Sequence, residues 1–342
     1  MTTGAPVLPD PASPDAGVAW HYGQPLAEQR MLAQGHGSVD LSHHGVVTVT
    51  GPDRLSWLHS LTTAQLEHLA PGESRLALIL SPHGHVEHEL HVIDDGACTW
   101  IITQPGDTDA VVSYLRSMQF MLRVEVRDAS GEFGVVWQPV GDVLDGHPTW
   151  IVPGDYSGGV PVDSGSDRGG DAARYVPQRP AVLVGREVIV PRAQLATVLG
   201  DERAGTWARE ALRVAAAVPR AGFETDHRTL PHEVGWIGAG VHLAKGCYRG
   251  QEAVARVHNL GAPPRRLVLL HLDGSDERLP VHGGAVRVDG REVGWIASVA
   301  QHYELGPIAT AVVKRSMSDD AAVEVDTPHG PVRASVQRVV AA

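Results

Sequence analysis

Cysteine and lysine are both scarce in this chain of 342 residues. Its two cysteines, Cys98 and Cys247, are too few for a disulfide scaffold, and too few for a four-thiolate zinc or iron–sulfur site within one chain. The only lysines are Lys245 and Lys314, so almost every cation is an arginine. Each lysine is therefore worth considering for a specific role.

Net positive charge and long apolar runs are absent as well. The formal net charge of −12 argues against a protein that binds nucleic acid directly or lies on a membrane surface. No apolar run reaches the roughly 18 residues that a membrane-spanning helix needs. The first 19 residues have neither a basic start nor an apolar stretch, so they do not resemble a signal peptide. We expect a cytoplasmic protein with no nucleic-acid and no membrane partner.

What remains is a globular balance, with 43% hydrophobic and 20% charged residues. The length suits two or three packed domains. Residues 1–35 are predicted to be a flexible leader, and residues 36–262 an α+β body with a variable insertion, rich in glycine, aspartate and serine, at 141–180. Residues 263–342 alternate in short apolar runs separated by turns such as Asp289-Gly290, which is typical of a small β-barrel.

The most informative stretch reads Lys-Gly-Cys-Tyr-Arg-Gly-Gln-Glu at residues 245–252. Cys247 lies between Lys245 and Arg249, and cations beside a thiol stabilise the thiolate, which is its nucleophilic form. Two glycines in the same stretch permit a turn that would expose the sulfur. The alternative is a small buried apolar side chain, which is the role of most free cysteines. Spacing alone leaves both interpretations open.

A second feature is a local excess of positive charge. Residues 203–266 carry ten Lys or Arg against five Asp or Glu, in a protein that is acidic overall. A basic pocket in an acidic protein favours a small anionic ligand. A solvated helix face explains the same count without any ligand, so this interpretation also stays open.

Histidine and glutamate alternate along one face of a predicted strand, at His83, His85, Glu87, Glu89 and His91. Such a set has the donor types that bind a metal ion. Its spacing matches no closed metal site, and a polar or ligand-lining face explains it equally well. We therefore predict no metal site.

These features combine in one resemblance. The octapeptide at 245–252 resembles the signature of the YgfZ family, a folate-binding branch of the glycine-cleavage T-protein (GcvT-like) superfamily, in which the cysteine is the hallmark residue. The similarity extends over residues 36–342. Further matching segments lie at residues 40–53, 61–63, 212–214 with Pro219, 230–235, 254–256, 305–309 and 313–315.

The resemblance implies a folate-binding body of two ferredoxin-like halves and a C-terminal β-barrel, arranged around a central channel. It implies a reduced folate as ligand, either tetrahydrofolate or a one-carbon derivative. It further implies an accessory protein, not a conventional turnover enzyme, for the assembly or repair of iron–sulfur client proteins, including enzymes that thiolate tRNA. Two alternatives stay open: a folate-dependent aminomethyltransferase-type one-carbon transferase, and an interaction module that has lost its ligand.

Roles for individual residues follow from the same resemblance. Glu233 is expected to bind the pterin, because a carboxylate pairs well with adjacent N–H donors. Arg265 is expected to contact the folate, with Arg266 as the alternate, and Trp100 to stack near the ligand. Glu89 stands where T-proteins have an aspartate that assists one-carbon transfer. Because its carboxylate reaches one methylene further, we assign Glu89 to lining the ligand.

Within the signature, Cys247 and Lys245 are the expected catalytic residues. Arg256, in the segment that continues the match, is assigned to folate binding. If the thiol carries the function, replacing Cys247 by serine should abolish it in cells while folate binding and the fold survive. The other motif residues are Gly246, Tyr248, Gly250, Gln251 and Glu252.

Overall fold

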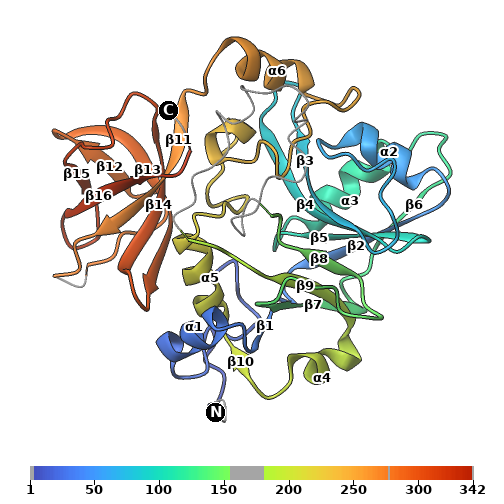
Figure 1. Cartoon of the computed structure of the whole chain (residues 1–342), viewed down its shortest axis with the longest axis horizontal. Helices are drawn as coiled ribbons and strands as arrows, with labels where there is room; N and C mark the ends of the chain where they lie inside the picture. Colours follow the sequence, from blue (N-terminus) through green and yellow to red (C-terminus); the bar gives the residue numbers. More distant parts are fainter. Residues whose placement is uncertain (1–3, 155–180, 276–277, 341–342) are drawn as a thin grey trace.

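The computed structural model describes residues 4–154, 181–275 and 278–340. Figure 1 shows two five-stranded sheets on one side of the molecule and a closed six-stranded barrel on the other. The two sheets form the body, and helix α5 (Thr206–Ala215) lies between the body and the barrel. The predicted α+β fold with a C-terminal β-barrel is confirmed.

The first sheet has the strand order β3-β4-β5-β2-β6, and all its neighbouring strands are antiparallel. Along β4 the alternation sends Leu90 and Val92 into a core covered by two helices, while Glu89 and His91 point to the opposite face. Both faces are buried, so these polar side chains lie inside the protein. The elements are β2 (Gly45–Thr50), α2 (Arg54–Leu61), β3 (Ser74–Leu80), β4 (Val86–Asp94), β5 (Cys98–Thr103), α3 (Thr108–Ser117) and β6 (Glu125–Asp128).

The second sheet has the order β10-β1-β7-β9-β8. Its β1–β10 pair is parallel and its other pairs are antiparallel. Strand β8 packs against β3 and β4, which joins the two sheets around a shared core. The elements are β1 (Ser38–Asp40), β7 (Phe133–Gln138), β8 (Thr149–Ile151), β9 (Arg186–Pro191), the 3-10 helix η2 (Arg192–Gln194), α4 (Leu195–Leu199) and β10 (Arg203–Ala204).

The barrel closes in the order β11-β14-β13-β12-β15-β16, and β16 pairs with β11. Its first strand shows why it is stable: Val268 and Leu270 fill the interior, while Leu267 and Leu269 pack outward on α5. The strands are β11 (Arg265–Leu272), β12 (Ala285–Val288), β13 (Arg291–His302), β14 (Gly306–Lys314), β15 (Val323–Val325) and β16 (Val332–Arg338).

A long connection carries the chain from α5 to the barrel and contains the 3-10 helix η3 (Pro231–Val234) and helix α6 (Gln251–Leu260). In Figure 1, α6 lies beside the ends of β3 and β4. The octapeptide therefore lies at the start of α6, beside the first sheet, with its last two residues in the first turn of the helix.

The predicted flexible leader is wrong for residues 4–35. Helix α1 (Pro25–Ala33) packs against α5, and Val7 forms a β-bridge with His21. Asp15 is only 5% exposed. The proline-rich composition of this segment excludes long regular structure, but a few buried contacts are enough to place it on the body.

The predicted insertion at 141–180 falls largely outside the described residues, because positions 155–180 are not described. Within its described part lies strand β8, whose Trp150 is 3% exposed and belongs to the core shared by the two sheets. The insertion prediction is therefore wrong at β8. Flanking glycine and aspartate residues obscured a strand of three residues.

Candidate functional site

An open cavity of about 720 Å³ lies on the body where the start of β4 meets the β5–α3 turn and residues 221–227. We call it the outer cleft. Its volume suits a drug-sized ligand. His88 Nδ1 lies 2.8 Å from Asp107 Oδ2 across one wall. Its ionisable residues are His85, Glu87, His88, Asp107, Asp226 and His227.

One wall of the outer cleft is held by Arg265 at the start of β11. Its guanidinium donates to Asp226 Oδ2 at 2.7 Å and to Glu233 Oε2 at 2.7 Å. Asp226 faces the cleft, whereas the side chain of Glu233 is fully buried behind the arginine. Burial raises the pKa of Glu233 despite the arginine, whereas hydrogen bonds from Arg265 and Thr229 outweigh burial and lower the pKa of Asp226.

Gln104 separates the outer cleft from a second cavity and lines both. This inner chamber has a volume of about 30 Å³, room for about two water molecules. It lies between the two sheets and α5. Its polar and aromatic lining consists of His44, Glu89, His91, Gln104, Trp150, Arg209, Arg213 and Arg220.

Glu89 is fixed in the inner chamber by three donors. Its Oε2 accepts from the backbone N–H of Ala221 at 2.8 Å and from Gln104 Nε2 at 3.1 Å, and its Oε1 lies 3.3 Å from His91 Nε2. Glu89 is thus a buried carboxylate whose position is set by β4, the turn after β5 and the segment after α5.

His91 links Glu89 to Glu187 on the second sheet. Its Nδ1 lies 2.6 Å from Glu187 Oε2, and its ring stacks on Trp150 with centroids 3.7 Å apart. Burial alone would lower the pKa of His91, yet the two carboxylates raise it to about 9. His91 is therefore an imidazolium at neutral pH, and each of its N–H groups donates to a carboxylate.

Three arginines line the inner chamber, and each has a carboxylate partner. Arg209 pairs with Glu187 at 3.0 Å. Arg213 pairs with Glu224 at 3.1 Å, and Arg220 pairs with Asp15 at 2.7 Å. The predicted cationic pocket does not form, because its excess arginines meet carboxylates such as Glu187 and Asp15 that lie outside residues 203–266. Sequence counting over one segment could not include these counter-ions.

The octapeptide exposes Cys247 at the surface. The next residue, Tyr248, is 8% exposed and belongs to the core shared by the two sheets, so it anchors the loop. Gln251 Nε2 closes the loop by donating to the backbone oxygen of Lys245 at 3.2 Å. Glu252 is exposed in the first turn of α6. The sulfur is thus presented by a loop whose ends are fixed, and the alternative of a buried apolar cysteine is excluded.

Lys245 points into the protein. Its Nζ donates to the backbone oxygens of His59 and Thr62, at the C-terminal end of α2. A cation there satisfies carbonyl groups that the helix leaves without partners. Burial lowers the pKa of Lys245 to about 8. These contacts give Lys245 an anchoring position, in contrast to the catalytic role predicted beside the thiol.

Two glycine turns connect the octapeptide to the rim of the outer cleft. Gly250 has φ +83°, and a Cβ there would lie 2.5 Å from the backbone oxygen of Ser81 and 3.0 Å from Gly84 Cα. Only glycine permits this close approach in the left-handed region. Two residues after the thiol-bearing residue, Arg249 Nη1 donates to Glu87 Oε2, a cleft residue, at 3.1 Å. Cys247 therefore belongs to a loop joined to the cleft.

Two predicted folate-binding residues lie elsewhere. Trp100 packs edge-on against Phe133 with ring centroids 4.9 Å apart, and its Nε1 donates to Asp95 at 2.7 Å. It shares a sheet face with Glu89 but pairs with Ile93, toward the far end of β4. Arg256 is exposed on α6. Glu89 thus lines the inner chamber, and Arg265 and Glu233 lie behind Asp226 of the outer cleft, whereas neither Trp100 nor Arg256 lines either cavity.

Several chamber and cleft residues were not singled out from the sequence. Asp226, Arg220 and Glu187 fall in segments without any motif, and Asp15 lies in the predicted leader. Only His91 had a signal, since it belongs to the alternating histidine–glutamate set. The alternate arginine, Arg266, is 1% exposed and pairs with Asp319 at 2.6 Å, away from Glu233.

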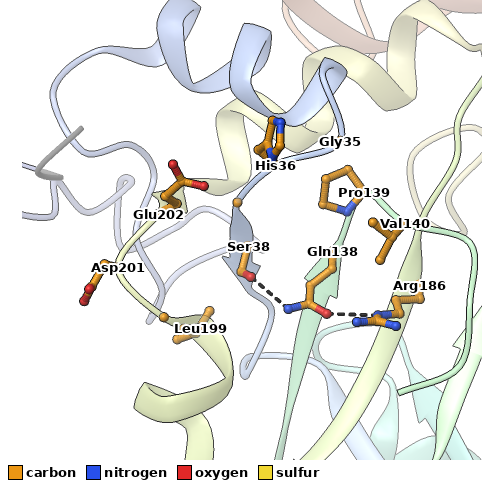
Figure 2. A pocket seen from close by; sticks show the side chains of 12 residues that line it. Gly35, His36, Ser38, Gln138, Pro139, Val140, Arg186, Leu199, Asp201 and Glu202 are labelled. Atoms are coloured by element: carbon orange, nitrogen blue, oxygen red, sulfur yellow. Dashed lines mark hydrogen bonds between the residues drawn. The ribbon is translucent and has the colours of Figure 1, made fainter. Parts of the chain in front are cut away.

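A separate pocket of about 380 Å³ lies at the edge of the second sheet (Figure 2). Figure 2 shows Gln138 between Ser38 and Arg186: its amide donates to Ser38 Oγ at 3.1 Å and accepts from Arg186 Nε at 2.9 Å. None of the predicted site residues lines it. These side chains bond to one another and to Val198 and Asp142, so we assign this pocket no role.

Metal and membrane binding were also considered. Among the described residues, no three His, Cys, Asp or Glu side chains are grouped so as to hold a metal ion. In the same part of the chain, no helix combines the length and apolarity that crossing a bilayer requires.

The protein thus has a two-sheet body, which contains buried carboxylates, and a closed barrel. Comparisons with known proteins identify its class. Residues 18–137 match the GCVT N-terminal domain, and residues 265–340 match the glycine cleavage T-protein C-terminal barrel domain. The aminomethyltransferase T of Bartonella henselae superposes with a TM-score of 0.73 over 97% of this chain and 92% of its own, at 18% identity. The chain therefore belongs to the GcvT-like superfamily.

Relatives within the superfamily carry different names. An aminomethyltransferase of Streptomyces avermitilis is 27% identical over 321 residues, which cover 85% of this chain and 82% of that protein. A mitochondrial iron–sulfur cluster assembly factor homologue of Cryptococcus neoformans is 26% identical over 255 residues, covering 69% and 66%. A putative chloroplastic transferase of Arabidopsis thaliana is 26% identical over 297 residues, covering 79% and 64%.

Proposed function

We propose that this protein binds a reduced folate in the outer cleft and that Cys247 serves iron–sulfur cluster assembly or repair beside that ligand. The observation that carries the proposal is the joint between the octapeptide and the cleft, made by Arg249 with Glu87 and by Gly250 against the turn at Gly84. These contacts support a role of the exposed thiol, two residues before Arg249, beside a ligand bound in the cleft. A relative named as an iron–sulfur cluster assembly factor homologue supports the same role.

The residues of the outer cleft fit a reduced folate. A pterin presents adjacent N–H donors, for which a carboxylate held by an arginine is a directional acceptor. Asp226 offers such a carboxylate on the cleft side of Arg265, with Glu233 behind it. The inner chamber, at about 30 Å³, is too small for a pterin ring as it stands. Tetrahydrofolate or a one-carbon derivative would therefore bind first in the outer cleft.

Cys247 suits a role toward a partner protein. Its exposure lets a client thiol, an iron centre or a sulfur carrier reach it without opening the fold. Lys245 and Tyr248 hold the loop from beneath, so the sulfur position is preorganised. We infer that iron–sulfur client proteins, including tRNA-thiolating enzymes, approach from this side.

Calorimetry with 5-formyl-tetrahydrofolate tests the folate half of the proposal. We expect saturable binding by the wild type, with loss of affinity in Glu233→Gln, because neutralising this side chain releases Arg265. Ligand at 100 times the Kd should raise the free energy of unfolding by about 2.7 kcal/mol. Trp100→Phe is the matched control and should bind as the wild type does. Absence of binding to the wild type would sink the proposal.

The thiol half is tested in cells that depend on this protein. Cys247→Ser should abolish support of iron–sulfur enzymes while leaving folate binding intact. Cys98→Ser is the control, because Cys98 is half-buried on β5 and lies on a different element. Equal activity of Cys247→Ser and wild type would remove the thiol from the function.

A folate-dependent one-carbon transferase of the aminomethyltransferase type is the second candidate. It is favoured by the rigid setting of Glu89, whose carboxylate is held by Ala221, Gln104 and His91. Relatives named aminomethyltransferase support it. It requires formation of methylene-tetrahydrofolate from an aminomethyl donor, with loss of that product in Glu89→Gln. Failure to form the product leaves the accessory role.

A further inference from the structure

Asp15 is buried although its surroundings in the chain are not. All the remaining residues between positions 4 and 17 are exposed or partly exposed. Of residues 8–17, only the Asp15 side chain makes hydrogen bonds or ion pairs with the rest of the described chain. Its carboxylate accepts from Arg220 Nη2 at 2.7 Å and lies 3.1 Å from His43 Nε2. One acidic side chain thus holds the segment.

Arg220 lies where the two cavities meet. It lines the inner chamber, and its Nε donates to Gln104 Oε1 at 2.9 Å. The same Gln104 donates to Glu89 Oε2, and the next residue, Ala221, lines the outer cleft. Arg220, Gln104 and Glu89 therefore form the partition between cleft and chamber.

The counter-ion of Arg220 differs from those of its neighbours. Arg213 pairs with Glu210 on its own helix and with Glu224, whose Oε1 also accepts from Ser298 and Thr310 of the barrel. Those carboxylates cannot leave without disturbing α5 and the barrel. The carboxylate of Asp15, in contrast, can leave Arg220 when only the exposed segment that carries it is displaced. Arg220 also has a longer ion pair with Glu210 of α5, at 3.6 Å, but its nearest carboxylate, that of Asp15 at 2.7 Å, is the one in the chamber that is most easily exchanged.

We propose that Arg220 is a binding site for a carboxylate group of the ligand, and that Asp15 occupies it as a built-in competitor that latches residues 8–17 over the site. This proposal rests on the proposed folate site and adds its regulation. A reduced folate carries carboxylates, and an arginine guanidinium binds a carboxylate through paired N–H groups. When a ligand carboxylate replaces Asp15, the segment is released and the partition at Gln104 loses one of its supports.

The latch has a consequence that a purely structural ion pair lacks. A competitor that must be displaced raises the apparent Kd, which equals the intrinsic Kd divided by the fraction of molecules that are unlatched. Removing it should strengthen ligand binding while weakening the fold. A structural ion pair predicts weaker or unchanged binding together with the weaker fold. Affinity and stability therefore move in opposite directions only if Asp15 competes with the ligand.

The experiment compares Asp15→Asn with wild type and with Asp10→Asn, in the full chain, by calorimetry with 5-formyl-tetrahydrofolate. Asp10 lies in the same segment, is exposed and accepts only from its own segment, so it matches the charge change without touching Arg220. We expect about tenfold tighter binding by Asp15→Asn with a lowered Tm, a coupling of ordinary allosteric size. Asp10→Asn should match the wild type in both.

Acetate is a second probe that does not depend on folate. In Asp15→Ala the vacated guanidinium should take up acetate, so acetate should raise the Tm of this variant more than that of the wild type or Asp10→Ala. If the wild type binds folate and Asp15→Asn binds it no more tightly, the latch is overturned and the proposed function stands. If no variant binds folate but acetate rescues Asp15→Ala, the folate site fails and the carboxylate site at Arg220 stands. If acetate has no selective effect, the carboxylate site is overturned.

Discussion

The thiol-bearing octapeptide and the inner chamber are built in opposite ways. The octapeptide is one continuous stretch, its reactive atom is exposed, and its anchors, Lys245 and Tyr248, lie inside the same eight residues. The chamber is assembled from both sheets, α5 and the N-terminal segment, and its charges are buried and paired.

This difference implies that the octapeptide contributes mainly to function and the chamber mainly to stability. An exposed loop can meet a partner protein without a change in the fold, and its substitution should cost function before stability. A buried network of ion pairs cannot lose one member without a large cost in stability, because an uncompensated buried charge destabilises the folded state strongly. Substitutions in the chamber should therefore act on stability first. The predictions below test that contrast in order of decreasing effect on the free energy of unfolding.

The largest effect is expected from Arg213→Ala. Arg213 is 2% exposed, and its removal leaves the buried carboxylate of Glu224 without its cation and takes from Glu210 one of its three arginine partners. We expect a loss of about 3–5 kcal/mol in urea unfolding. Arg123→Ala, which breaks an exposed pair with Asp53, should leave the unfolding midpoint unchanged. Similar midpoints for the two variants would mean that the chamber pairs contribute no more than surface pairs.

The pH dependence of stability should report His91. Its folded pKa of about 9 lies above the ordinary value of 6.5, so its contribution is complete below pH 6.5 and is lost as the pH rises through 9. A shift of this size corresponds to about 3 kcal/mol. The contribution of Lys245 to stability rises with pH between 8 and 10.5, because its pKa is lowered in the folded state.

A variant of His91 separates its contribution to the pH dependence of stability from that of Lys245. The difference between wild type and His91→Gln should fall as the pH rises from 6.5 to 9, measured by thermal unfolding in a pH series. His83→Gln, at an exposed histidine of the same set, should show no such trend. A pH-independent difference for His91→Gln would show that the imidazole is neutral in the folded protein.

Gly250→Ala should disrupt the joint between octapeptide and cleft. A side chain at φ +83° is strained, and its Cβ would also meet the backbone of Ser81 and Gly84. We expect a loss of about 1–3 kcal/mol together with weaker folate binding. Gly72→Ala is the control, with φ +86° and no atom within 4 Å of the added Cβ, so it carries strain alone. Equal losses would mean that the close approach at Gly250 is unimportant.

Lys245→Met should cost about 1–2 kcal/mol, because the carbonyl groups of His59 and Thr62 lose a charged donor while desolvation of the ammonium is relieved. Lys314→Met, at the exposed lysine of the barrel, provides the comparison and should be neutral. Thermal unfolding measures both. If Lys245→Met left stability unchanged but abolished iron–sulfur support, the lysine would be catalytic instead of anchoring.

Cys247→Ser should have the smallest effect on stability, within about 0.5 kcal/mol, because the side chain is exposed. The same variant should have the largest effect on function in cells. Denaturation and iron–sulfur enzyme activity measured together test both statements. A strongly destabilised Cys247→Ser would contradict the contrast between the two regions.

The fold class was predictable because its signals are local. Alternation along residues 86–94 and the turn-separated runs after residue 265 identify strands directly, and the octapeptide identifies the superfamily. Strand β8 and the packed segment at residues 4–35 were missed, since glycine- and proline-rich composition hides short elements. Composition reports the conformational freedom of a segment, but not the few contacts that overcome it.

The site was predictable only in part. Of the predicted residues, Glu89 lines the inner chamber, Arg265 and Glu233 lie behind Asp226 of the outer cleft, and Trp100 and Arg256 lie away from both cavities. Resemblance transfers a residue by its place in the chain. It does not transfer the packing that decides where an aromatic ring such as that of Trp100 points, and here Phe133 and Asp95 hold it elsewhere.

By itself, the sequence determined the strands, the barrel and a thiol placed between glycine turns, because each depends on residues that are neighbours along the chain. Tertiary structure alone decided that Arg209 meets Glu187, that His91 lies between two carboxylates, and that Asp15 reaches Arg220 from 205 positions away. Charge in a protein interior depends on which distant groups burial brings together, and a count over one segment misses the counter-ions that come from elsewhere in the chain.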